Sequence, residues 1–360
     1  MEPIFIQTIK NNFGDEGEAW LSALPDLIDE ASRRWELADI QPLPNLSYHF
    51  VALALSGASD SEGTPALAGG ARGRWAIQAT RPSIAPRKAR GSAQELVILK
   101  LGVPNRELTS EIAALRIYNG QGACRLLDAD AEKGMLLLER LQPGHMLATL
   151  EDDERATRIA AEVMIQLWKS SNDFSRYIAT APAKASGARE VATTDFIYLK
   201  DWFDGFKRLH QRYGGGTGPL PEKLVETAEI LSRELLTENK DEVLLHGDFH
   251  HFNVLESERS WLAIDPKGVV GPKGYEVGPL LINPVPDFLN GSNPRAQTEK
   301  RIDILSEVLD MERERIHSWA ICHAVLSAWW SLEDNNQGRG EYSLRCAELF
   351  TTLLANNLPV

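Results

Sequence analysis

The chain has little cysteine. Its 360 residues include three, Cys124, Cys322 and Cys346, which are far apart and form no CxxC pair. This number and spacing indicate neither a disulfide framework nor a zinc ribbon, and they are typical of a reducing compartment. The sequence also lacks an apolar leader segment after Met1 and any run of 18 uninterrupted apolar residues. We therefore expect a cytoplasmic protein that does not span a membrane.

Positive charge is also scarce. The chain has 38 lysine and arginine residues against 51 aspartate and glutamate residues, which gives a net charge of −13. An acidic chain repels phosphate backbones and anionic lipids, so nucleic acid and membrane surfaces are poor partners. The same charge suits a small cationic substrate, although acidic residues also serve solubility alone. The composition gives no indication of an oligomeric state.

The order of sequence patterns predicts an α+β chain in two parts. Residues 1–141 contain β-rich runs, and residues 142–360 are mostly helical, which predicts a small N-terminal lobe and a larger C-terminal one. In the first part we expect helices over Glu18–Trp35 and Glu107–Tyr118 and strands over Leu46–Leu55, Glu95–Leu101 and Met135–Leu141. In the second part we expect helices over Glu151–Ser171, Thr194–Tyr213, Glu222–Leu236 and from Gln297 onward, with short strands at Val243–Leu245, Asn253–Leu255 and Trp261–Ile264.

One segment departs from both patterns. Residues 66–94 carry six basic residues, no acidic ones and few large apolar ones, so we expect an inserted loop without a core of its own. The segment separates the first two predicted strands. Only Gly57 and Gly63 are candidates for a glycine-rich loop there, and no GxGxxG is present. The insertion therefore casts doubt on phosphate binding at that loop, though less on the fold.

The most informative stretch is LLHGDFHHFNVLESERSWLAIDPKG, over residues 244–268. Asp248 precedes Asn253 by five positions, and Asp265 ends an apolar run twelve positions later. This order is typical of a kinase catalytic loop and its metal-binding aspartate. Phosphoryl transfer needs one carboxylate to accept the proton of the acceptor hydroxyl and hard oxygen ligands to hold Mg²⁺. The spacing therefore predicts a phosphotransferase that uses ATP or GTP with Mg²⁺.

HGDFHHFNVL followed by WLAIDPKGVVG resembles the aminoglycoside phosphotransferase family, and more narrowly its streptomycin 6-kinase and hydroxyurea-resistance branch. The similarity extends to LVILKLGVPNRELTSEIAALRIYNGQGACRLLDAD, LLLERLQPG and YEVGPLLINP. It implies a bilobal protein-kinase-like fold, with a nucleoside triphosphate and Mg²⁺ as cofactors. By position, it implies that Asp248 is the catalytic base and that Asn253 and Asp265 hold the metal.

Several other residues are candidates for the nucleotide site. Lys100 ends a predicted strand, and Glu111 lies on the apolar stripe of a helix, where a buried carboxylate needs a cation. We therefore expect the lysine–glutamate pair of kinases. Glu139 and Leu141 lie at the predicted lobe junction, where backbone groups would meet the base. Lys267 is a candidate for neutralising phosphate charge.

His246 has two interpretations. With His250 and His251 it could form a transition-metal site, but the strand–turn–strand setting and the lack of an HExxH helix favour a residue that orients the catalytic loop.

The acceptor site is the least determined part. Acidic residues beside the helical cleft would bind a cationic, hydroxylated acceptor such as streptomycin, and the candidates are Asp201, Asp204, Glu333 and Asp334. Each could instead be a solvated helix charge. Kinases of the choline, homoserine or ketosamine type share the same loop, so they stay open as alternatives. Two other classes remain, namely a catalytically silent binding protein and a metal-dependent hydrolase.

Overall fold

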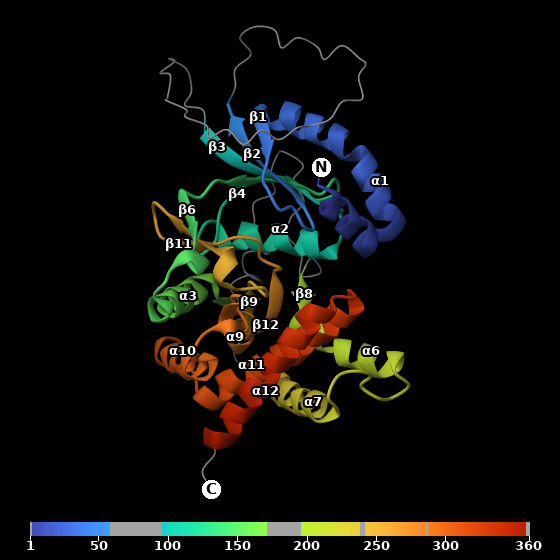
Figure 1. The fold of residues 1–360 in the computed structure, drawn as a ribbon. Coiled ribbons are helices and arrows are strands. Elements are labelled where there is room, and N and C mark those ends of the chain that lie inside the picture. The colour runs from blue at the N-terminus through green and yellow to red at the C-terminus, as the bar shows by residue number, and fades with distance from the viewer. Residues whose placement is uncertain (1, 58–94, 171–195, 238–241, 286, 358–360) are drawn as a thin grey trace.

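A long helix opens the chain. The computed structural model describes residues 2–57, 95–170, 196–237, 242–285 and 287–357 (Figure 1). Helix α1 (Pro3–Trp35) begins 15 residues earlier than predicted, because Phe5 and Ile9 are fully buried. It continues through Pro25 without ending there. The non-helical residue is Gly14, with φ 52° and ψ −130°, a conformation that glycine adopts readily.

The first part of the chain forms a five-stranded antiparallel sheet in the order β1–β2–β3–β5–β4. Its strands are β1 (Leu37–Pro42), β2 (Phe50–Ser56), β3 (Glu95–Leu101), β4 (Leu126–Asp130) and β5 (Met135–Glu139). The three predicted strands correspond to β2, β3 and β5. The first begins at Phe50 rather than Leu46, because residues 43–49 connect it to β1. The edge strands β1 and β4 were not predicted.

A different helix packs against each face of this sheet. Phe50, Ala52, Leu99 and Leu101 are buried in one hydrophobic cluster with residues of α1. Helix α2 (Arg106–Tyr118) lies below the sheet in Figure 1, on the side of the helical part. Its buried residues belong to the larger hydrophobic cluster of the C-terminal part. This helix therefore ties the sheet to the rest of the molecule.

Helix α2 has clear boundary signals. The Asn105 side chain caps its start by accepting a hydrogen bond from the Leu108 backbone at 2.8 Å. Its end is Asn119 in the left-handed conformation. The prediction of a helix over Glu107–Tyr118 is confirmed to within one residue.

The second part is mostly helical. The predicted helix over Thr194–Tyr213 is confirmed in part among the residues that the structure describes: Ile197–Tyr198 pair as strand β8, and the rest is helical in two pieces, α5 and α6, which meet at Asp204. Thr194 and Ser171 lie outside the described residues. The helices are α3 (Asp153–Leu167), α5 (Leu199–Phe203), α6 (Gly205–Arg212), α7 (Glu222–Thr237), α8 (Val277–Leu281), α9 (Asp287–Asn290), α10 (Pro294–Leu309), α11 (Arg313–Glu333) and α12 (Gln337–Asn357).

Two small sheets position the predicted catalytic segment. One has the order β7–β9–β12–β8 and the other β11–β10–β6. The three short strand predictions coincide with or overlap β9, β10 and β11. The strands are β6 (Pro143–Met146), β7 (Lys169–Ser170), β8 (Ile197–Tyr198), β9 (Glu242–Leu245), β10 (Val254–Ser257), β11 (Trp261–Ala263) and β12 (Val269–Pro272), with 3₁₀ turns η1 (Leu147–Thr149), η4 (His251–Asn253) and η5 (Lys273–Glu276).

Within the described ranges, no helix has the length and apolarity needed to cross a membrane. The division of the chain at residue 141 stays a prediction. The predicted basic loop, residues 66–94, and the candidate glycine Gly63 lie outside the described residues.

Candidate active site

The loop that carries Asp248 is held by His246, at the end of β9. The His246 ring accepts the Asp248 backbone N–H at Nδ1 (3.3 Å) and donates from Nε2 to the Ile264 carbonyl (2.8 Å). Both bonds need a neutral ring with its proton on Nε2. Burial lowers the pKa of His246 to about 4, so the neutral form is the stable one. His246 is therefore bonded to both sides of the loop, the arrangement that a loop-orienting residue requires, and this favours that interpretation of the two.

A buried carboxylate that the sequence analysis missed supports the same loop. Glu276 is fully buried and accepts the backbone N–H groups of His246 at 2.8 Å and Gly247 at 2.9 Å. Burial raises the pKa of Glu276 to about 7, against the lowering effect of these two bonds. The sequence did contain a sign of this role. Glu276 is the acidic residue in the apolar run YEVGPLLI, and a carboxylate buried in such a run needs hydrogen-bond partners.

Asp248 faces the cleft. Its side chain is 41% exposed and its Oδ1 lies 3.7 Å from His250 Nε2. Burial alone would raise the pKa of Asp248, but His250 and Lys267 hold it below its ordinary value. The side chain is therefore an ionised proton acceptor at neutral pH.

The structure brings Asn253 and Asp265 next to this loop. The Ile264 N–H donates to the Asn253 carbonyl at 2.9 Å, and the Lys267 N–H donates to the His246 carbonyl at 2.7 Å. The Asn253 amide nitrogen donates to the Asp248 carbonyl at 3.0 Å, which leaves its Oδ1 as an acceptor. Asp265 itself has φ +60°, an uncommon conformation that turns its carboxylate out of the strand direction. Two hard oxygen groups thus meet beside Asp248.

Lys100 and Glu111 pair as predicted. Lys100 Nζ lies 2.6 and 2.7 Å from the two Glu111 oxygens, and both side chains are almost fully buried. The same Nζ also forms an ion pair with Asp265. Although burial opposes its charge, these two carboxylates raise the pKa of Lys100. Lys100 therefore stays protonated and links strand β3, helix α2 and the loop after β11.

A serine adds a second link between α2 and the loop after Asp265. The Ser110 hydroxyl donates to the Gly268 carbonyl at 2.6 Å, and it accepts the Ile197 N–H at 3.3 Å. Gly268 has φ +65°, and a Cβ there would lie 2.4 Å from the Ser110 carbonyl oxygen. Only glycine fits this close approach.

In the segment predicted to bind the nucleotide base, Glu139 to Leu141, one backbone N–H is already used within the protein. The Glu139 N–H donates to the Arg125 carbonyl at 3.0 Å, so it is not available to a base. The Glu139 carboxylate accepts the Arg125 N–H at 2.6 Å and forms a bidentate pair with Arg259. Glu139 is therefore a structural side chain at this edge. Leu141 is buried two residues later, before the turn into β6.

The connection between the first two strands lies elsewhere than predicted. Since β1 is the true first strand, residues 43–49 connect it to β2, and the Leu43 N–H donates to the Val51 carbonyl at 2.8 Å. Gly57 follows Ser56, which pairs with Glu95 at the other end of β2. Glu95 is five residues from Lys100, or about 17 Å along the strand. Gly57 therefore lies at the end of β2 that is remote from Lys100, which does not favour it as a phosphate-covering glycine. The effect of the inserted segment on phosphate binding stays an expectation of the sequence, since residues 58–94 lie outside the described residues.

Three of the four predicted acceptor-binding acids are already paired, each with a different cation. Asp201 lies 3.5 Å from Arg106, Asp204 lies 2.6 Å from Lys207, and Glu333 lies 3.1 Å from Arg208, all at partly exposed positions. Asp334 differs because burial and its neighbours Glu333 and Glu107 raise its pKa. Asp334 thus lies in the field of other carboxylates, which favours an added cation there.

An aromatic cluster lies beside Asp248. A Cβ on Gly247 would lie 3.0 Å from the Trp202 ring, and the Trp202 ring meets that of Trp330 edge to face at 5.3 Å. Behind them the Tyr275 hydroxyl bonds His323 Nδ1 at 2.8 Å. Trp202 and Trp330 are only partly buried, so they flank the exposed side of the catalytic loop.

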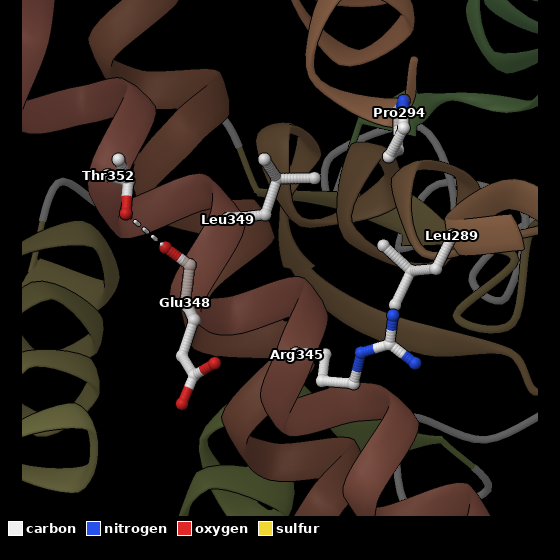
Figure 2. Close-up of a pocket in the computed structure, with 6 residues that line it drawn as sticks. All are labelled: Leu289, Pro294, Arg345, Glu348, Leu349 and Thr352. Carbon is white, nitrogen blue, oxygen red and sulfur yellow. Dashed lines mark hydrogen bonds between the residues drawn. The ribbon is translucent and has the colours of Figure 1, made fainter. Parts of the chain in front are cut away.

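A separate hollow lies between α9, α10 and α12. Figure 2 shows its lining residues, which are Leu289, Pro294, Arg345, Glu348, Leu349 and Thr352. None of the predicted site residues lines it.

Comparison with known proteins agrees with this geometry. The sequence profile of the aminoglycoside/hydroxyurea antibiotic resistance kinases matches residues 76–335. A streptomycin 6-kinase of Streptomyces glaucescens is 28% identical over 325 residues, 90% of this chain and 88% of the relative. A hydroxyurea phosphotransferase of Kitasatospora aureofaciens is 30% identical over 354 residues, 96% of this chain and 91% of the relative.

Solved structures confirm the predicted fold. The aminoglycoside phosphotransferase APH(4)-Ia superposes with a TM-score of 0.55 at 13% identity, over 91% of this chain and 99% of that one. A choline kinase of Streptococcus pneumoniae gives 0.51 at 13% identity, over 92% and 99%. The bilobal kinase-like fold and the expected phosphotransferase class are both confirmed. The chain is a kinase that belongs to the aminoglycoside/hydroxyurea antibiotic resistance kinase family.

Proposed function

We propose that this kinase transfers the γ-phosphate of ATP to a hydroxyl of streptomycin or of a similar aminocyclitol that carries guanidinium groups. The observation that carries the proposal is the placement of an ionised Asp248 within the electrostatic influence of Asp265 and Lys267, where Asp265 belongs to the Lys100–Glu111–Asp265 cluster. Asp334, whose pKa is raised by burial and by two neighbouring carboxylates, is the proposed site for the charge of the acceptor. The similarity to streptomycin 6-kinases from two Streptomyces species supports the choice of acceptor.

The reaction follows from these positions. The Asp248 carboxylate accepts the proton of the acceptor hydroxyl while that oxygen forms a bond to the γ-phosphorus. The bond between the γ-phosphorus and the β–γ bridging oxygen breaks, and ADP leaves with the electron pair. His246 and Glu276 keep the loop in place through its backbone, without contact with the reacting atoms.

The donor set fits Mg²⁺. Asn253 Oδ1 and the Asp265 carboxylate would hold it, and Mg²⁺ is commonly bound by one or two such protein groups together with phosphates. Bound there, the ion neutralises charge on the phosphates. No group of three or more His, Cys, Asp or Glu side chains forms a metal site in the described part of the chain. A site completed by the nucleotide is consistent with both observations.

The remaining residues hold the nucleotide. Lys100, kept in place by Glu111, would bind the inner phosphates, and Lys267 would bind the terminal one, since Asp265 and Asp248 raise the pKa of Lys267 despite its burial. Leu141 offers backbone groups to the base. The need for ATP supports a cytoplasmic place of action.

The acceptor side fits a cation. Asp334 supplies charge, and the Trp202–Trp330 pair supplies ring surface beside Asp248. Guanidinium and ammonium groups bind both kinds of group. The aromatic pair also suits a quaternary ammonium alcohol, so choline is the second candidate acceptor.

A direct assay tests the proposal. Purified protein is mixed with Mg-ATP or Mg-GTP and with streptomycin, choline, homoserine or a ketosamine, and ADP or GDP release is measured. We expect release with ATP only when streptomycin or a related aminocyclitol is present. Release that needs no acceptor would indicate a hydrolase. Streptomycin binding without any release would indicate a silent binding protein.

A further inference from the structure

The loop over the expected phosphate site has an unusual composition. Residues 43–49 read LPNLSYH and contain no glycine, although a phosphate-covering loop ordinarily offers backbone N–H groups through close approach. The loop ends in His49, next to Phe50, the first residue of β2. Its side chain can donate a hydrogen bond from a ring nitrogen.

Strand alternation fixes the face on which His49 lies. Phe50 is buried in the cluster that faces α1. Successive residues of a strand point to opposite faces, so His49 and Val51 face the other way, toward the cleft. Val51 pairs directly with Lys100, and the same register places His49 opposite Gly102. His49 is thus a diagonal neighbour of Lys100 on the cleft face.

Contacts agree with this register. A Cβ built on Gly102 would lie 2.5 Å from His49 Cδ2 and 3.1 Å from its Nε2, so the imidazole covers this glycine. The charged groups that face the ring are Lys100 on β3 and Asp265 and Lys267 from the loop after β11. Burial and the two lysines lower the pKa of His49 to about 3, against the effect of Asp265. The ring is therefore neutral and has one N–H to donate.

We propose that His49 binds the terminal phosphates of the nucleotide through a ring N–H, in the place that backbone amides of a glycine-rich loop would take. His49 is the diagonal neighbour of Lys100, and Lys267 and Asp265 also act electrostatically on its ring. A phosphate held by the two lysines would therefore lie near the ring N–H. His49 is then a binding residue that the N-terminal sheet contributes to the phosphate site. The inference rests on the proposed nucleotide role of Lys100 and Asp265.

Nucleotide binding without an acceptor tests the proposal. Calorimetry compares Mg²⁺ with the ATP analogue AMP-PNP against AMP, which lacks the terminal phosphates. For His49→Ala we expect AMP-PNP binding to weaken about tenfold, the value of one hydrogen bond to a charged group. AMP binding should stay unchanged, and His49→Gln, which keeps an N–H donor, should recover part of the loss. His210→Ala, on the outer helix α6 and paired with Glu229, is the matched histidine control.

Two results would overturn the proposal. Equal weakening of AMP and AMP-PNP would mean that His49 only shapes the loop, and unchanged AMP-PNP binding would mean that it makes no phosphate contact. Because no acceptor is present, neither result bears on the choice of streptomycin. Wild-type protein that binds AMP-PNP but phosphorylates no aminocyclitol would instead count against the proposed function alone.

Gly102 provides an independent check. Gly102→Ala would displace the His49 ring, so it should weaken AMP-PNP binding in the wild-type background and have little further effect in the His49→Ala background. Equal losses in both backgrounds would mean that Gly102 acts through the sheet rather than through His49, and the proposal would fail.

Discussion

The proposed phosphate site and the proposed acceptor site differ in how their charges are buried. At the proposed phosphate site, Lys100 and Glu111 are nearly fully buried and share one network with Asp265. At the proposed acceptor site, Asp201, Asp204 and Glu333 are partly exposed and pair with exposed arginines and lysines. Buried charges are costly to leave unpaired, whereas exposed pairs contribute little. The phosphate side is therefore fixed in advance, and the acceptor side is free to adapt.

The largest effect is expected where the two sides meet. Asp248→Ala removes the proton acceptor, so kcat should fall about 10³-fold, within the range for a general base. Nucleotide affinity should stay nearly intact, because Asp248 acts on the acceptor. Steady-state kinetics with calorimetry of ATP binding measures both. Asp204→Ala is the matched exposed control, and wild-type turnover by Asp248→Ala would show that the base has been misassigned.

The next effect concerns the metal. Asp265→Asn should remove most of the tightening of ATP binding that Mg²⁺ produces, a loss of about tenfold or more, because a neutral amide is a weaker ligand than a carboxylate. Calorimetry with and without Mg²⁺ measures it. Asp248→Asn, which changes a neighbouring carboxylate in the same way, should keep the Mg²⁺ dependence. Equal metal dependence in Asp265→Asn and the wild type would contradict the metal role.

A smaller effect is expected behind the catalytic loop. Glu276→Gln turns an amide NH₂ toward a backbone N–H that needs an acceptor, so the unfolding free energy at pH 5 should drop by about 1–3 kcal/mol. Chemical denaturation measures the loss, and kcat should fall more than KM changes. An unchanged unfolding free energy would mean that the two backbone groups find other acceptors.

The same residue predicts a pH dependence. The folded pKa of Glu276, about 7, is above its ordinary value of 4.5, so the folded state holds this proton more tightly. The resulting stabilisation is fully present below pH 4.5 and is lost as pH rises through 7, up to about 3 kcal/mol at 1.36 kcal/mol per pKa unit. The stability difference between wild type and Glu276→Gln should therefore fall between pH 5 and pH 8. A constant difference would mean that Glu276 is ionised throughout.

The smallest effect is expected on the acceptor side. Asp334→Asn should raise KM for a cationic acceptor by about two- to fivefold at low salt, because one exposed carboxylate contributes little in water. The effect should shrink at high salt and be absent for ATP. Asp204→Asn, already paired with Lys207, should change neither constant. A large, salt-independent effect of Asp334→Asn would show that the acceptor side is as rigid as the phosphate side.

The contrast also explains what the sequence could predict. Asp248, Asn253 and Asp265 lie within 18 residues, on the loop after β9 and at the two ends of the β10–β11 hairpin, so local pattern was sufficient. Lys100 and Glu111 were found because a carboxylate on an apolar stripe needs a cation. Glu276 lies about 30 residues from its partners, and nothing local connects them.

Strand predictions failed at the edges of the first sheet. In β1 only Leu37 is buried, Asp39 has φ +51°, and the register shifts between Ala38 and Gln41. An edge strand of this kind has no alternation of apolar and polar residues to recognise. Because β1 was not predicted, the covering loop was expected after β2 rather than between β1 and β2. For this reason His49 was overlooked and Gly57 was considered instead.

The pairing of Ser56 with Glu95 makes this end of the hairpin a natural place to add sequence. The chain leaves β2 and returns to β3 at neighbouring positions, so any segment placed between them needs to close only one strand spacing. Loop closure costs rise slowly with length, and Lys100 lies at the opposite end of the same strand. A reporter, an affinity tag or a second domain is therefore best inserted here, at the end of β3 remote from Lys100.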